Sequence, residues 1–144
     1  MKNWLNNGWV KKHKTSSQEI KNLLGVAERD MSDSETSGLS PDWKLNIAYN
    51  AALQIATAAL AASGYRTARE SHHFRTIQSL KFTIDADEEL IVLFDKFRKK
   101  RNISGYDRAG TISKQEAQEM KDLAEYLYRI TKEWLAKNRP SLLK

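Results

Sequence analysis

The sequence contains no cysteine. Disulfides, thiolate metal sites and cysteine nucleophiles are therefore excluded, and the chain suits a reducing compartment. An apolar run long enough to span a bilayer is also missing, and the first residues lack the apolar core of a secretion signal. We therefore expect no membrane association, and we expect the protein to be cytoplasmic.

Signatures of common cofactors are missing as well. The sequence has no Gly-rich phosphate loop and no Glu-x-x-His pairs of the kind that build a carboxylate-bridged metal centre. His72 and His73 are adjacent, so on a helix they would point about 100° apart, an unsuitable arrangement for a shared metal ion. We therefore expect no metal and no other cofactor, with one of these histidines packed and the other in solvent.

The composition is that of a globular protein with an excess of positive charge. Of 144 residues, 29% are charged and 40% hydrophobic, which is enough for a core in a single domain. The formal net charge of +6 favours an anionic partner, either nucleic acid or an acidic protein, and does not choose between them.

Apolar spacing and capping residues predict an all-α bundle of about five helices, mostly antiparallel, with no strand. The predicted helices run from residue 17 into the polar stretch 32–38, then over 41–63, 67–82, 85–104 and 113–138. Asp85 is expected to cap the fourth of them. We expect residues 1–15 to form a basic N-terminal arm or a short helix, and 16–144 to form one helical-bundle domain. The basic run 11–14 is either a solvated linker or an arm for nucleic acid.

Arg101 continues the apolar stripe of the predicted fourth helix. Phe94, Phe97 and Arg101 all fall within about 40° of Leu90 on a helical projection. A guanidinium at the end of a core-facing stripe must find an acceptor, an anion or a cleft. The alternative is purely structural, because the helix dipole favours cations in the last turn and Gly105 suits a helix end.

Tyr49 and Asn50 interrupt the alanine-rich face of the predicted helix 41–63. One interpretation is a polar network that faces Arg101. The other is an ordinary core tyrosine whose hydroxyl is satisfied locally. The sequence leaves both open.

Two stretches of the chain together resemble the HEPN superfamily. The first runs from Leu45-Asn46-Ile47-Ala48-Tyr49-Asn50-Ala51-Ala52 through Gly64-Tyr65 to Ser71-His72-His73, and the second is Phe97-Arg98-Lys99-Lys100-Arg101-Asn102-Ile103-Ser104-Gly105-Tyr106-Asp107. The resemblance covers about residues 16 to 139. It implies a small helical bundle, commonly a homodimer with the motif in an interface cleft. It also implies a metal-independent ribonuclease or a toxin paired with a nucleotidyltransferase-like antitoxin.

The chain departs from the family motif at one position. That motif is an arginine, a polar residue that is often asparagine and, a few residues later, a histidine. Arg101 and Asn102 match it, but Tyr106 stands where the histidine would be, and no histidine follows. A tyrosine, with its pKa near 10, transfers protons poorly at neutral pH. Phosphate binding by Arg101 therefore survives the departure better than catalysis does.

These considerations assign candidate roles to seven residues. The candidate catalytic residues are Arg101, Asn102 and Tyr106, the candidate RNA- or phosphate-binding residues are Arg98, Lys99 and Arg101, and the supporting residues are Tyr49 and Asn50.

Three functions fit the sequence. The first is an RNA-binding protein that cleaves RNA weakly. The second is a non-catalytic module that binds a nucleotidyltransferase-like antitoxin or another partner protein. The third is a purely structural bundle whose charge maintains solubility.

Overall fold

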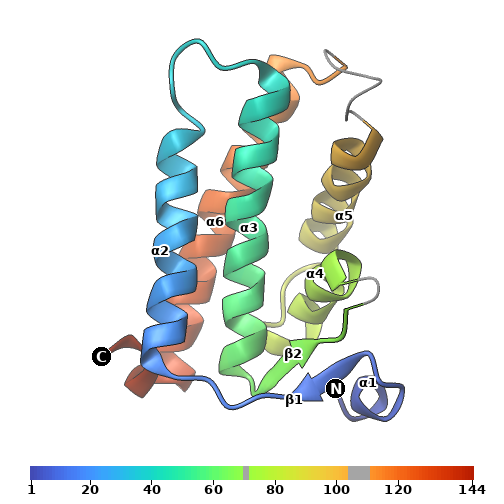
Figure 1. Ribbon diagram of the computed structural model, residues 1–144, viewed down its shortest axis with the longest axis vertical. Helices are drawn as coiled ribbons and strands as arrows, with labels where there is room; N and C mark the ends of the chain where they lie inside the picture. The colour runs from blue at the N-terminus through green and yellow to red at the C-terminus, as the bar shows by residue number, and fades with distance from the viewer. Residues whose placement is uncertain (70–71, 104–110) are drawn as a thin grey trace.

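The computed structural model is a mostly helical bundle, as predicted (Figure 1). It describes residues 1–69, 72–103 and 111–144, with residues 102 and 103 described by their backbone alone. The elements are α1 (Lys2–Asn6), β1 (Val10–Lys12), α2 (Ser17–Asp33), α3 (Pro41–Ala62), β2 (Tyr65–Thr67), α4 (His72–Thr83), α5 (Glu88–Ile103), α6 (Lys114–Asn138) and η2 (Pro140–Leu143).

Helix α3 is the centre of the fold and packs against α2, α4, α5 and α6. It begins where the Ser40 hydroxyl accepts a hydrogen bond from the Trp43 amide, with Pro41 in the first turn. It ends before Gly64, whose φ of +96° is a conformation that glycine adopts readily. The many buried alanines of α3 allow its neighbours to approach closely.

The composition of α3 also bears on the expectation that the chain has no membrane-spanning segment. Within the described residues, α3 is the one helix long and apolar enough to cross a bilayer, although the sequence led us to expect no such segment. Its apolar window is 72% buried by the rest of the chain, which is the usual situation of a core helix.

Helix α6 begins as the sequence predicts. Ser113 and Glu116 form a capping box in which the serine hydroxyl accepts from the Glu116 amide and the glutamate side chain accepts from the Ser113 amide. At the start of α2 only half of the predicted capping box is present. The Ser16 hydroxyl accepts from the Glu19 amide, but the Glu19 carboxylate contacts His13 instead.

The expectation of no strand was wrong. β1 and β2 pair antiparallel, with Lys11 opposite Arg66, and the helix predicted from residue 67 begins at His72 instead. Three-residue strands are too short to show a periodicity, and their partners lie far apart in the sequence.

The N-terminal segment contains both a helix and a strand. The basic run 11–14 is partly in β1, and α1 is the predicted short N-terminal helix. Trp4 of α1 packs edge-on against Trp9.

The expected cap of the fourth long helix was also wrong. Helix α5 begins at Glu88, and the Ile91 amide donates to the Asp87 carbonyl. Asp85 lies before the helix with a φ of +54°, in the left-handed region that aspartate tolerates better than most residues.

The alanines of α3 give a test of the packing. Ala59 is fully buried, so Ala59→Leu should overpack the core and lower the free energy of unfolding by about 1–3 kcal/mol. The same change at exposed Ala136 on α6 is the control and should alter it by less than about 0.5 kcal/mol. Denaturant unfolding of both variants measures the difference. Equal effects would contradict the packing described for α3.

Candidate functional site

Helices α3, α4 and α5 bring together three side chains that are far apart in the sequence. The Tyr49 hydroxyl of α3 lies 3.3 Å from Nδ1 of His73 on α4. The guanidinium carbon of Arg101, on α5, lies 5.0 Å from the centre of the Tyr49 ring. We call Tyr49, His73 and Arg101 the tyrosine–histidine–arginine cluster.

Tyr49 occupies the middle of this cluster and is fully buried. Its ring meets that of Phe94 edge-on at 5.6 Å, an arrangement that favours aromatic contact. Burial raises the pKa of Tyr49 to about 12, against the opposing effect of the Arg101 and Arg98 charges. The hydroxyl therefore stays protonated at neutral pH and serves as a fixed hydrogen-bonding partner for His73.

His73 is half-buried at the edge of the cluster. Burial lowers its pKa, and the charges of His72, Arg101 and Arg98 lower it further. The imidazole is therefore neutral at pH 7. When its Nδ1–H donates to the Tyr49 oxygen, Nε2 keeps a lone pair that can accept a proton.

Neighbouring His72 is arranged differently. It is exposed, and its Nδ1 lies 2.7 Å from the Thr67 hydroxyl at the end of β2. The two imidazole centres are 5.0 Å apart. The expectation that one histidine is packed and the other solvated is therefore confirmed. Within the described residues, no group of three metal-ligating side chains is present.

Two other predicted phosphate-binding residues lie on the same helix as Arg101. Arg98 donates from Nε to Oδ1 of Asp95 at 2.7 Å, and Nζ of Lys99 lies 3.5 Å from Oδ2. Asp95 is itself buried, so it offsets part of the positive charge that α5 carries here. The Arg98 guanidinium also lies 5.3 Å from the ring of exposed Phe74.

The remaining predicted residues are not part of the cluster as described. The Asn50 amide donates to Asp30 on α2 at 2.7 Å, so Asn50 is engaged with α2 and not with Arg101. The backbone of Asn102 belongs to the last turn of α5, but its side chain, like the whole of Tyr106, is outside the described part of the chain.

Sequence reasoning missed the placement of His73 beside Tyr49. In the sequence the adjacent histidines are unsuitable metal ligands and belong to the stretch that resembles the HEPN superfamily. Their position relative to Tyr49 depends on how α4 crosses α3, and no local pattern encodes that crossing. The helical periodicity of apolar residues could indicate one part of the site, namely that Arg101 continues the apolar stripe of α5.

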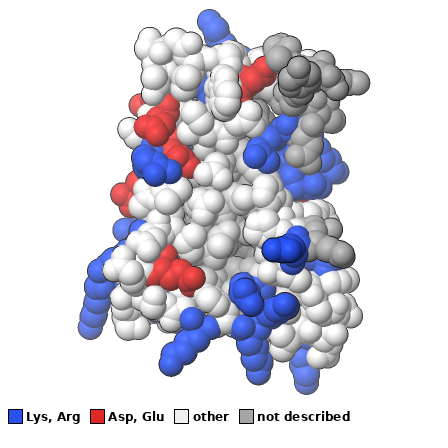
Figure 2. Space-filling view, in the orientation of Figure 1, with Lys and Arg blue, Asp and Glu red and all other residues white. Residues whose placement is uncertain are grey.

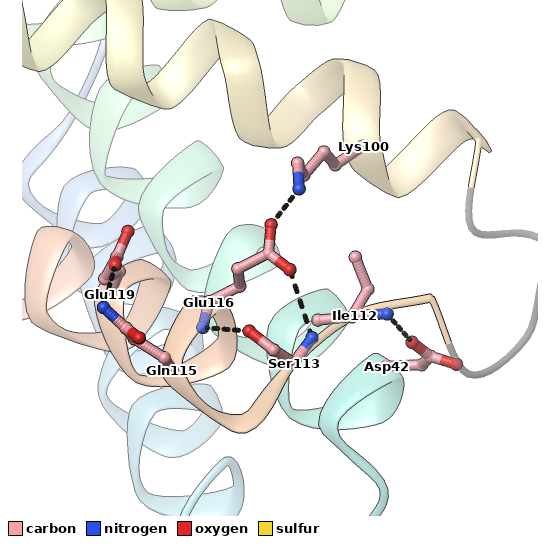
Figure 3. Close-up of polar contacts among 7 residues, drawn as sticks. All are labelled: Asp42, Lys100, Ile112, Ser113, Gln115, Glu116 and Glu119. Atoms are coloured by element: carbon pink, nitrogen blue, oxygen red, sulfur yellow. Dashed lines mark hydrogen bonds and ion pairs between the residues drawn. The ribbon is translucent and has the colours of Figure 1, made fainter.

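The C-terminal end of α5 is fastened to the start of α6 next to the cluster. Lys100 pairs with Glu116, which also accepts from the Ser113 amide (Figure 3). One residue earlier, the Ile112 amide donates to Asp42 at the start of α3, with 3.3 Å between nitrogen and oxygen. These contacts fix the turn that carries Arg101 relative to α3.

Positive charge gathers on the face of the molecule shown in Figure 2. Lys and Arg side chains cluster over the α5 side and along the lower end, where β1 and β2 lie in Figure 1. A separate hollow of about 530 Å³ lies between the α2–α3 connection and α6. There Lys121 pairs with Glu35 and Glu125, so its charge is already compensated.

Comparison with protein-family models, curated proteins and solved structures gives no match.

The lowered pKa of His73 predicts a pH dependence of stability. The usual pKa of histidine is about 6.5, and the unfolded chain binds a proton at His73 near this pH. The folded protein binds that proton only at a lower pH, so lowering the pH from 7 decreases the free energy of unfolding until the folded-state pKa is passed. His73→Gln should therefore lose less stability than the wild type between pH 7 and pH 5. Denaturant unfolding across this range measures it.

His72→Gln provides the matched control, because His72 is an exposed histidine on the same turn. It should lose an amount of stability on acidification that lies between those of the wild type and His73→Gln, because burial still lowers the His73 pKa although the charge of His72 no longer does. The same loss in all three proteins would contradict the described environment of His73.

Proposed function

We propose that this protein binds single-stranded RNA and cleaves it at the tyrosine–histidine–arginine cluster. The observation that supports this function is the contact of the buried Tyr49 hydroxyl with the half-buried imidazole of His73, next to the Arg101 guanidinium that lies over the Tyr49 ring. A neutral imidazole can remove the proton of an attacking 2′-hydroxyl, and a guanidinium can stabilise the negative charge that increases on the phosphoryl oxygens.

The reaction is an internal displacement at phosphorus. The ribose 2′-oxygen bonds to phosphorus and its proton passes to Nε2 of His73, while the bond from phosphorus to the 5′-oxygen breaks. The leaving 5′-oxygen takes a proton from water. The products are a 2′,3′-cyclic phosphate and a 5′-hydroxyl. Arg101 binds the non-bridging oxygens, on which negative charge increases in the transition state.

His73 is suited to the role of base because its pKa is lowered. An imidazole that is neutral at pH 7 can accept a proton, whereas Tyr49, with its pKa near 12, cannot. In this proposal α4 supplies the imidazole that the Arg101–Tyr106 segment lacks. Tyr49 is a positioning residue, since it orients His73 without touching the phosphodiester.

RNA is favoured over other anions by the surroundings of the cluster. Cleavage by internal attack needs a 2′-hydroxyl, which DNA does not have. Phe74 is 40% exposed next to His73 and offers an aromatic surface to an unstacked base. Arg98, which lies close to this ring, adds positive charge for the backbone.

The wider implications of the family resemblance stay predictions. These predictions are membership of the HEPN superfamily, a homodimer with a shared cleft, pairing with a nucleotidyltransferase-like antitoxin, and a cytoplasmic location. The proposal above does not need any of them, because its three side chains come from one chain.

Cleavage of a fluorescent single-stranded RNA in the presence of a chelator tests the proposal. His73→Gln should lower the cleavage rate by about 100-fold or more, because the base is lost. Arg101→Gln should have a comparable effect through the loss of charge stabilisation. Tyr49→Phe should lower kcat more than it changes KM. The wild-type products should carry 2′,3′-cyclic phosphate ends.

Two variants serve as controls for this assay. Lys137→Gln removes an exposed cation near the far end of α6, and His72→Gln removes the neighbouring imidazole. Both should cleave within about threefold of the wild type, since neither side chain is part of the cluster. Cleavage that persists unchanged in His73→Gln, or a wild type that neither binds nor cleaves RNA, would refute the proposed function.

A further inference from the structure

A second candidate surface lies between α5 and α6, in the half of α5 that precedes the cluster. It is a groove of about 500 Å³. Its floor is apolar, formed by Leu90 and Leu93 of α5 and by Leu123 and Tyr126 of α6. We call this surface the α5–α6 groove. Tyr126 is 42% exposed and Leu93 is half-buried, whereas Leu90 and Leu123 are buried and form the deeper part of the floor.

The rim of the α5–α6 groove is acidic. Asp87 and Glu89 lie at the start of α5, and Glu119 and Asp122 lie on α6. Among the described residues, none of these four carboxylates forms an ion pair. Glu119 accepts from the uncharged Gln115 amide on the preceding turn of α6, as Figure 3 shows.

An uncompensated acidic rim is unexpected in a chain with a net charge of +6. No Lys or Arg is among the residues that line the groove. The apolar surface also continues past the rim, because Val92 on α5 is 60% exposed beside a neighbouring hollow that shares Glu89 and Leu93. Lys96 lines this neighbouring hollow, and the Arg129 guanidinium, which pairs with Glu133, lies 5.1 Å from the centre of the Tyr126 ring. The groove itself is bordered by carboxylates, and an apolar groove with an acidic rim is typical of a protein-docking site.

We propose that the α5–α6 groove binds a basic amphipathic helix of a partner protein. Apolar residues on one face of such a helix would cover Leu93 and Tyr126, and its flanking lysines or arginines would pair with the rim. The seven-residue step from Glu119 to Tyr126 spans about 10 Å, so two to three turns of the partner would fill the groove.

This docking site is separate from the tyrosine–histidine–arginine cluster. The groove uses residues 87–93 of α5, whereas Arg98 and Arg101 lie one to two turns further along the same helix. RNA binding and helix docking can therefore be measured independently, and the failure of one does not decide the other.

A synthetic peptide is a suitable probe. It has about four helical turns, with leucine at every third or fourth position and lysine on both flanks. A second peptide carries glutamate in place of every lysine. Fluorescence anisotropy should show that the wild-type protein binds the basic peptide at least about tenfold more tightly than the acidic one. High salt should weaken this binding.

Two matched charge reversals locate the binding site. Asp122→Lys changes the rim, and Asp33→Lys changes another exposed acid, at the end of α2. Asp122→Lys should weaken binding of the basic peptide by about tenfold, and Asp33→Lys by less than twofold. Leu93→Ser should weaken it as well, through the apolar floor. Thermal melts establish that each variant is folded.

Three results would overturn the proposal. The first is equal binding by the two charge-reversal variants, and the second is equal binding of the basic and acidic peptides. The third is wild-type self-association, seen by sedimentation, that Asp122→Lys abolishes. In that case the occupant of the groove is a second copy of this chain and not a basic helix.

Discussion

The burial of one tyrosine hydroxyl determines how the candidate site is built. Tyr49 is enclosed by the core, where a phenol without a hydrogen-bonding partner would be destabilising. Its partner is Nδ1 of His73, so the same contact gives the phenol oxygen a hydrogen-bonding partner and orients the imidazole. The ring of Tyr49 also receives the Arg101 guanidinium on its face. Because Tyr49 lies on α3, the cluster is built on the helix against which α2, α4, α5 and α6 pack.

The second constraint is electrostatic. Two guanidiniums and two imidazoles lie near one another, and such an arrangement is tolerable only if some groups lose or balance their charge. His73 does so by staying neutral, and Arg98 does so by pairing with buried Asp95. A neutral imidazole beside a fixed cation is the combination that gives the cluster its proposed chemistry. The acids of the α5–α6 groove lie away from this region, so they leave its positive charge intact.

The helices could be predicted because their signals are local. Ser113 and Glu116 lie three residues apart and form the capping box that their types indicate, and Arg101 follows the stripe set by Phe94. Pairing of β1 with β2 could not be predicted, since each strand has three residues and a distant partner. The contact between Tyr49 and His73 depends on how α4 crosses α3. Asn50 points about 100° away from its neighbour Tyr49 on α3, as any two adjacent helical residues do, and its partner Asp30 on α2 could not be identified from a local pattern.

The most direct test of this account is NMR titration of the histidine imidazoles, which is simple because the chain has only His13, His72 and His73. The account predicts that the pKa of His73 lies below the usual 6.5 and rises in Arg101→Gln, because a neighbouring positive charge is removed. A His73 pKa at or above 6.5 that does not change in Arg101→Gln would show that His73 and Arg101 do not form one site.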